Sequence, residues 1–162
     1  MNSSMELYFA YGSNMSRRRI LSRVAGARSL GRARIDGWRL RFDKPGRDGT
    51  GKANLVEEPR AHAWGVVYEL PAAEWAVLDR FEPGYRRERL RVAIDASSTA
   101  VHSYLFSTQI EPPPPAPTQQ YLAHLLEGAC EHGLPASHMD YIRSFLDSTA
   151  SRPTQDGSAS AS

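Results

Sequence analysis

The stretch "YFAYGSNM", residues 8–15, joins an apolar segment directly to a Gly-Ser-Asn sequence suited to a tight turn. Gly12 has no side chain to restrict its backbone, and the serine and asparagine after it can hydrogen-bond neighbouring backbone groups or cap a helix. The pattern predicts a strand at 6–10, a turn, and a short helix at 16–24. Backbone N–H groups at such a turn also favour an anion, so the turn is either a plain connection or a ligand-binding element.

The composition is that of a soluble globular protein. The chain has 162 residues, of which 41% are hydrophobic and 23% charged, close to the averages for globular domains. This length fits a single domain, since domains commonly have about 100–200 residues. We therefore predict one domain over residues 1–148 and a disordered tail at 149–162, where serine, alanine and other small residues predominate.

The charge balance and the cysteine content argue against several classes of partner. A formal net charge of +2 is too small to indicate nucleic-acid binding by electrostatics. Cys130 is the only cysteine, which excludes an intrachain disulfide and argues against a cysteine-ligated zinc site. No signal peptide and no apolar stretch of roughly 18 residues is evident. We expect a cytoplasmic protein with neither a nucleic-acid nor a membrane partner.

Hydrophobic alternation predicts a strand-rich body after the first helix. Asp36-Gly37 is typical of a hairpin turn, and Pro71 is suited to open a short helix that ends near Phe81, because Pro83 disfavours helical geometry in the residue before it. The expected strands are residues 30–35, 37–43, 53–58, 64–70, 85–94 and 100–108.

The C-terminal part of the chain is predicted to be helical. A proline-rich stretch at 110–118 reads as a stiff extended connector inside the domain. Apolar residues at helical spacing then predict a helix over 119–132, ended by Gly133, and another over 135–146. A strand-rich body followed by helices indicates an α+β fold.

Three motifs for other chemistries are incomplete. Residues 46–52 read Gly-x-x-x-x-Gly-Lys, but Ala53 stands where a phosphate-binding loop needs Ser or Thr, and a strand is predicted next instead of a helix. No Gly-x-Ser-x-Gly is present, so Ser13 is expected to be a turn residue and not a nucleophile. No metal is expected, because tight ligand spacing is missing among the five histidines His62, His102, His124, His132 and His138.

Glu82 has surroundings suited to proton transfer. It lies between Phe81 and Pro83, where a helix gives way to a strand. Partial desolvation there would raise its pKa and make it an effective general base. The alternative is a solvated side chain paired with Arg86 or Arg87, which composition alone favours.

Five segments in consistent order resemble the γ-glutamylcyclotransferase family. They are "YFAYGSNM" (8–15), "WGVVYEL" (64–70), "LDRFEPGY" (78–85), "HSYLF" (102–106) and "PPPPAPTQQYLAHLLEGACEHGLP" (112–135). Five ordered segments are far more specific than a single turn motif. The resemblance implies an α+β fold with a mixed, barrel-like β-sheet of about six strands and surrounding helices.

The resemblance also implies an activity and a site. The activity is conversion of a γ-glutamyl amide or amine to 5-oxoproline with release of the free amine, and it needs no cofactor and no metal. The implied catalytic residue is Glu82, which takes a proton from the substrate's α-amine and passes it to the leaving nitrogen. The implied substrate-binding residues are Tyr8, Phe9, Ala10, Tyr11, Gly12, Ser13, Asn14 and Tyr121.

Other functions remain open at the level of sequence. A degenerate site would bind γ-glutamyl compounds without turnover, and a tailoring enzyme would remove a γ-glutamyl protecting group in secondary metabolism. The leaving group is expected to point toward the segments 44–52 and 110–118. A homodimer is expected from the frequency of this state among soluble proteins.

Overall fold

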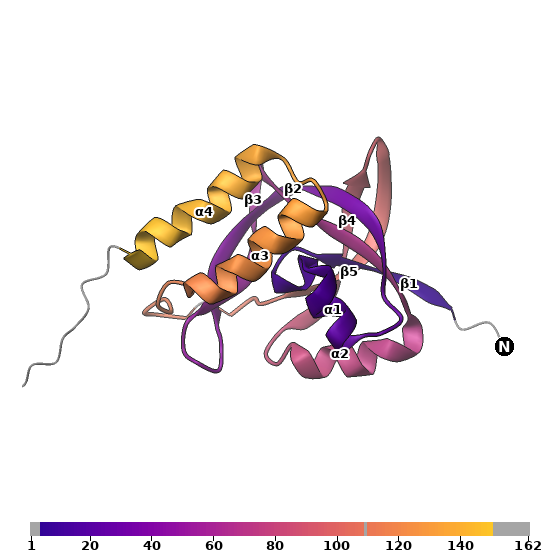
Figure 1. Ribbon diagram of the computed structural model, residues 1–162, viewed down its shortest axis with the longest axis horizontal. Coiled ribbons are helices and arrows are strands. Elements are labelled where there is room, and N and C mark those ends of the chain that lie inside the picture. Colours follow the sequence, from indigo (N-terminus) through magenta and orange to yellow (C-terminus); the bar gives the residue numbers. More distant parts are fainter. Residues whose placement is uncertain (1–3, 109, 151–162) are drawn as a thin grey trace, which may run out of the picture.

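The structure is a computed structural model that describes residues 4–108 and 110–150. Figure 1 shows a β-sheet body with helices on its outside. The strands are β1 (Met5–Ala10), β2 (Arg28–Pro45), β3 (Gly51–Pro71), β4 (Arg86–Ile94) and β5 (Ser97–Leu105). The helices are α1 (Arg17–Arg23), α2 (Trp75–Phe81), α3 (Gln119–Glu131) and α4 (Ala136–Ala150), with short 3₁₀ turns η1 (Ser13–Met15) and η2 (Ala72–Glu74).

The five strands close into a barrel in the order β1-β3-β2-β4-β5. Neighbouring strands are antiparallel except β1 and β5, which run parallel where the barrel closes. Closure removes free sheet edges, and alternate side chains then fill the interior. The predicted α+β fold with a mixed, barrel-like sheet is confirmed, with five strands where about six were expected.

The strand count differs because two predicted breaks are absent. The hairpin predicted at Asp36-Gly37 is wrong, since β2 continues through it and pairs with β3 on both sides. A register shift lies between Asp36 and Trp38, and Gly37 has φ +84°, so the glycine accommodates a bulge instead of a turn. The strands expected at 53–58 and 64–70 likewise form the single strand β3, which runs through Pro59.

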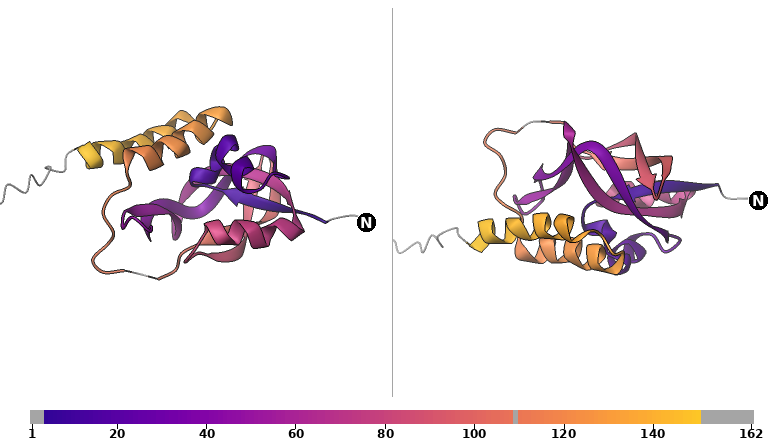
Figure 2. Two further views of the ribbon diagram at one scale, coloured as in Figure 1. Left: turned by 60° about the horizontal axis from the view of Figure 1, so that its bottom comes forward. Right: turned by 90° about the horizontal axis from the view of Figure 1, so that it is seen from above.

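Helices α3 and α4 form an adjacent pair that lies across one side of the barrel (Figure 2). Gly128 of α3 packs directly on the turn that follows β1: a Cβ added there would lie 2.3 Å from the carbonyl carbon of Met15 and 2.4 Å from the backbone nitrogen of Ser16. This close approach fixes α3, including Tyr121 near its start, relative to the turn at 11–16.

Replacing Gly128 with alanine should therefore destabilise the protein. The added methyl group meets backbone on the η1 side, which cannot move aside as a flexible side chain would, and overpacking of this kind costs about 1–3 kcal/mol. Urea unfolding followed by circular dichroism measures the change. The control is Cys130→Ala on the exposed face of the same helix, with an expected change within about 0.5 kcal/mol. Equal unfolding midpoints for both variants would contradict the packing argument.

The C-terminal helix extends further than predicted. It continues to Ala150 instead of ending near residue 146, and the rest of the predicted tail, residues 151–162, lies outside the described residues. Within the described chain, no helix is both long and apolar enough to cross a membrane.

Candidate active site

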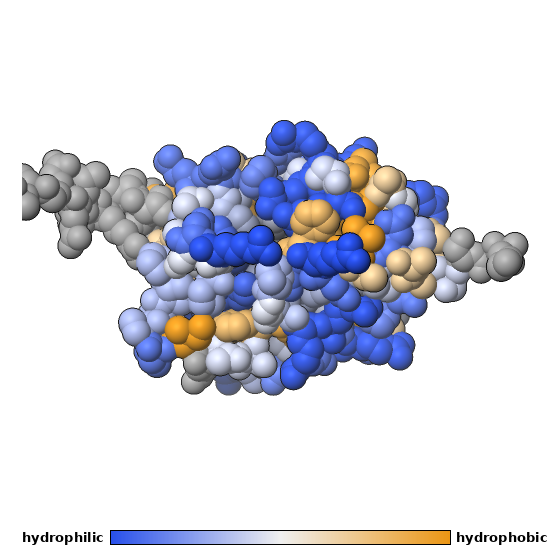
Figure 3. All heavy atoms as spheres, turned by 90° about the horizontal axis from the view of Figure 1, so that it is seen from below, coloured by the Kyte–Doolittle hydropathy of each residue, from blue (hydrophilic) through white to orange (hydrophobic). Residues whose placement is uncertain are grey.

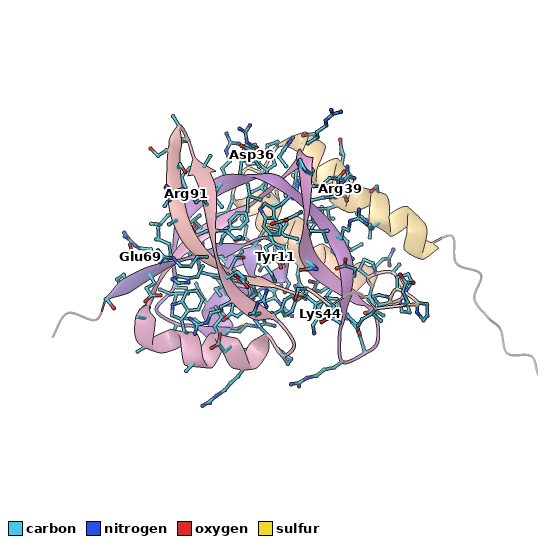
Figure 4. The ribbon with its side chains drawn as sticks, turned by 180° about the vertical axis from the view of Figure 1, so that it is seen from behind. Tyr11, Asp36, Arg39, Lys44, Glu69 and Arg91 are labelled. Carbon is cyan, nitrogen blue, oxygen red and sulfur yellow. The ribbon has the colours of Figure 1, made fainter. Side chains whose placement is uncertain are left out.

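Two adjoining cavities meet at Glu82. The inner cavity is lined by Tyr8, Tyr11, Gly12, Ser13, Asn14, Ala53, Glu82, Tyr85, Tyr104 and Tyr121. The outer cavity has a volume of about 380 Å³ and shares Ser13, Glu82, Tyr85 and Tyr121 with the inner one. Figure 4 shows Tyr11 inside the barrel and Lys44, which lines the outer cavity, near the loop between β2 and β3. The inner cavity is therefore a pocket of tyrosines that opens past a carboxylate.

Glu82 occupies the first position after α2, where the chain leaves the helix toward β4. Its side chain is 16% exposed. Burial raises its pKa to about 7, although Arg23, Asn14 and Lys44 act in the opposite direction. A carboxylate with this pKa can both accept and donate a proton at neutral pH. This burial excludes the alternative of a solvated Glu82. Arg86 and Arg87, the partners expected for a solvated carboxylate, form ion pairs with Glu88 and Asp79 instead.

Asn14 holds the Glu82 carboxylate in place. The Asn14 side chain is buried, and its Nδ2 donates to Glu82 Oε1 at 2.9 Å and to the Tyr8 hydroxyl at 3.1 Å. Arg23 Nη1 donates to the side-chain amide oxygen Oδ1 of Asn14 at 3.0 Å and lies 3.5 Å from Glu82 Oε1. The hydrogen bond from Asn14 and the contact from Arg23 both involve Oε1, so Oε2 is the oxygen better placed to meet a substrate.

The two tyrosines at the junction of the cavities are held by the backbone of one residue. Ala53, near the start of β3, donates its N–H to the Tyr121 hydroxyl at 2.9 Å and accepts from the Tyr85 hydroxyl at 2.7 Å. The Tyr121 O–H thus keeps its own proton available for donation. Burial raises the pKa of Tyr121 and of Tyr85 well above the usual range, so both stay neutral.

The turn after β1 contributes backbone and not a nucleophile. A Cβ at Gly12 would lie 3.0 Å from the Ala53 side chain and 3.5 Å from the Tyr121 hydroxyl, so glycine keeps this side of the pocket open. Ser13 Oγ accepts from Arg19 Nε at 2.9 Å, and neither cavity is lined by a histidine. Among the described residues, the hydrogen bonds leave the N–H groups of Gly12, Ser13 and Asn14 without an acceptor.

Most of the site residues inferred from the sequence come together. Phe9 and Ala10 are the exceptions: both are buried on β1 and line neither cavity. The sequence-based site omits Tyr85 and Tyr104, although both lie in segments that carry the family resemblance. It also omits the cationic residues of the outer cavity. In a chain with many arginines, the sequence does not show which positive charges gather at one site.

Residues 46–50 form the loop between β2 and β3, which confirms that the Gly-x-x-x-x-Gly-Lys sequence is not a phosphate-binding loop followed by a helix. Asp48 accepts from the backbone N–H of Thr50 at 2.9 Å inside this loop.

No group of three or more potential metal-ligating side chains gathers anywhere in residues 4–108 and 110–150. A larger cavity of about 710 Å³ lies elsewhere and contains none of the inferred site residues.

Comparison with known proteins identifies the family. Residues 8–123 match the family model described as "Gamma-glutamyl cyclotransferase, AIG2-like". The chain belongs to the γ-glutamylcyclotransferase family. Curated γ-glutamylcyclotransferases from Bos taurus and Homo sapiens are each 31% identical over 149 residues, covering 86% of this chain and 78% of the relative.

The fold comparison agrees with the sequence comparison. A solved structure named "Gamma-glutamyl cyclotransferase" superposes with a TM-score of 0.79 at 27% identity, covering 86% of this chain and 87% of that one. This member of the γ-glutamylcyclotransferase family is therefore an enzyme of the cyclotransferase type, built on the closed barrel described above.

Proposed function

We propose that this enzyme converts a small γ-glutamyl amide to 5-oxoproline and the free amine, with Glu82 as the residue that moves the proton. The observation that carries the proposal is the position of Glu82. Its carboxylate is fixed through Oε1 by Asn14, and burial raises its pKa to about 7 at the junction of the two cavities.

The reaction requires a base because the substrate's α-amine is protonated at neutral pH and an ammonium cannot attack. Glu82 accepts one proton from this ammonium. The freed amine then attacks the γ-carbonyl carbon of the same molecule, forming the C–N bond of a five-membered ring. Protonated Glu82 returns the proton to the leaving nitrogen as the original amide bond breaks. The ring nitrogen, which still carries two hydrogens after the attack, loses one of them, and the released amine, the stronger base, takes up this second proton and leaves as an ammonium. Because attacking and attacked atoms belong to one molecule, the enzyme has mainly to fold the chain and exclude water.

The inner cavity supplies groups that suit the γ-glutamyl part of the substrate. The N–H groups of Gly12, Ser13 and Asn14 are available to an anionic oxygen, such as the α-carboxylate or the oxyanion that develops on the γ-carbonyl. The neutral Tyr121 hydroxyl can donate one further hydrogen bond. We infer that Tyr8, Tyr11, Tyr85 and Tyr104 form the wall of this pocket.

The pH dependence of kcat/KM tests the role of Glu82. We expect activity to rise with pH through about 7, the pKa to which burial raises the carboxyl group, because only the ionised form accepts the proton. In Arg23→Met the same limb should move to higher pH, since Arg23 lowers the pKa of Glu82. The measurement is initial 5-oxoproline formation across pH at low substrate. A limb that stays at the same pH in this variant would assign it to another group.

A binding module without turnover is the alternative outcome. It predicts saturable calorimetric binding of γ-glutamyl compounds with no 5-oxoproline under any condition. A tailoring enzyme for a protected secondary metabolite would instead form 5-oxoproline only from one large amine. The homodimer and the cytoplasmic location stay predictions.

A further inference from the structure

The leaving amine must pass into the outer cavity if the γ-glutamyl group occupies the inner one. The two cavities share Glu82 and two tyrosines, Tyr85 and Tyr121, so the bond that breaks lies at this junction. The part of the substrate beyond the leaving nitrogen then faces residues that contact only the outer cavity. Their chemistry determines which amines the enzyme releases.

The outer cavity is strongly cationic. Among the described residues that line it, Asp48 and Glu82 are the acids, whereas six are cations: Arg19, Arg23, Lys44, Arg47, Lys52 and Arg80. Arg23 is paired with Glu82 and Lys52 with Asp48. The excess of positive charge therefore remains after the internal pairs are formed, and it favours an anionic occupant.

The chain's only two lysines lie opposite each other in this cavity. Lys44 of β2 and Lys52 of β3 are directly paired across the antiparallel ladder, where like charges are destabilising. Their ammonium groups flank the junction: Lys44 Nζ lies 5.0 Å from the centre of the Tyr85 ring, and Lys52 Nζ lies 4.6 Å from that of Tyr121. Two cations held this way are suited to one anion between or beside them.

Lys44 lacks the acidic partner that a buried lysine needs. It is only 8% exposed, and within the described chain no carboxylate lies within ion-pair distance of its ammonium. An unpaired buried charge is costly. Burial lowers the pKa of Lys44, and Lys52 and Arg47 act in the same direction, against an opposing effect of the Glu82 carboxylate. A carboxylate from a bound substrate would remove this cost.

We propose that the preferred leaving group is an amino acid with an acidic side chain, so that two carboxylates enter the cationic outer cavity. This inference rests on the proposed cyclotransferase function and adds the class of amine released. Charged side chains predominate in the lining, although the apolar ring of Phe81 is part of it. Figure 3 looks at the side of the molecule where α2 lies and shows mostly hydrophilic residues with apolar spots among them.

The test compares two substrates that differ in one charge. We expect kcat/KM for γ-glutamylglutamate to exceed that for γ-glutamylglutamine by about tenfold or more, mainly through KM, as for a charge-assisted contact in a partly solvated site. Raising the ionic strength should reduce this ratio. In Lys44→Met the ratio should fall by about tenfold, and Lys44→Arg should restore much of it. Lys52→Met is a second variant for the same test. The Lys52 side chain is more exposed than that of Lys44, so its replacement should disturb folding less.

The matched control is Arg91→Met. It removes one positive charge from the β4–β5 hairpin, which Figure 4 shows well away from Lys44, and it should leave the ratio unchanged. A wild-type ratio of one or less, with 5-oxoproline formed, would overturn the inference and leave the cyclotransferase function intact. If no compound yields 5-oxoproline, the proposed function fails, and calorimetric binding of the same two compounds then decides whether the acidic one is preferred.

Discussion

Glu82→Gln is expected to reduce 5-oxoproline formation by about 10²- to 10⁴-fold, the usual contribution of a positioned acid–base group. Glutamine has nearly the same shape and keeps a carbonyl oxygen that can accept the Asn14 hydrogen bond seen at 2.9 Å. It cannot take a proton from the substrate's ammonium. The loss should therefore appear in kcat, with substrate binding by calorimetry largely retained.

The same variant should be more stable than the wild type at high pH. Burial raises the pKa of Glu82 from 4.5 to about 7, so the folded protein favours the protonated form. The resulting penalty on stability is absent below about pH 4.5, grows as pH rises, and is complete above about pH 7. It reaches about 3 kcal/mol at most. Glutamine carries no charge and avoids it, so thermal or urea unfolding should show a gain that increases with pH.

Glu57→Gln is the control for both measurements, because Glu57 is an exposed glutamate on β3 outside the two cavities. It should change neither activity nor the pH dependence of stability. Full activity of Glu82→Gln would refute the proton-transfer role. Loss of activity accompanied by loss of stability at all pH values would instead indicate a structural role.

Asn14→Ala should have the next largest effect. The variant removes the hydrogen bond that lowers the pKa of Glu82. It also removes the Asn14 partner of the buried Tyr8 hydroxyl and the Asn14 oxygen that accepts from Arg23. We expect the acid limb of kcat/KM to move above pH 7 and activity at neutral pH to fall by about 10- to 100-fold. Stability should fall by about 1–3 kcal/mol, as for other unsatisfied buried polar groups.

Asn54→Ala separates these two effects. Asn54 is equally buried, but its side chain bonds Asp43 and the backbone of Phe106 instead of Glu82. It should lower stability by a similar amount without moving the acid limb. If both variants move the limb equally, or if neither does, Asn14 does not set the ionisation of Glu82.

Local sequence patterns predict those helix boundaries that are marked by a glycine or a proline. Gly133, with φ +64°, ends the region of α3 as expected, and Pro71 precedes the helical turn that begins at Ala72. The role of Glu82 is implied by the family resemblance, since composition alone favours a solvated side chain. Pro83 by itself predicts only where α2 ends. Each of these boundaries follows from the backbone preference of a single glycine or proline, so it can be predicted without knowledge of the tertiary structure.

Properties that depend on pairing between distant segments were not predictable in this way. Asp36-Gly37 has the residues of a hairpin turn. However, β2 pairs with β3 both before and after this dipeptide, and Gly37 forms a bulge within the strand. The link between Asn14 and Glu82 joins residues far apart in the chain. The importance of Lys44 emerges only once Lys52 is seen to lie opposite it.

Among the described residues, helices α1 and α2 supply three of the cations of the outer cavity, and the hairpin of β2 and β3 supplies the other three, Lys44, Arg47 and Lys52. The loop of this hairpin and both lysines border the outer cavity, whereas Glu82, Asn14 and the turn at residues 11–14 come from other segments. Exchange of this one hairpin tip between relatives would therefore alter which amines are accepted while the ring-closing apparatus is inherited unchanged. Substrate range in such a barrel can diversify through a few residues of a single loop.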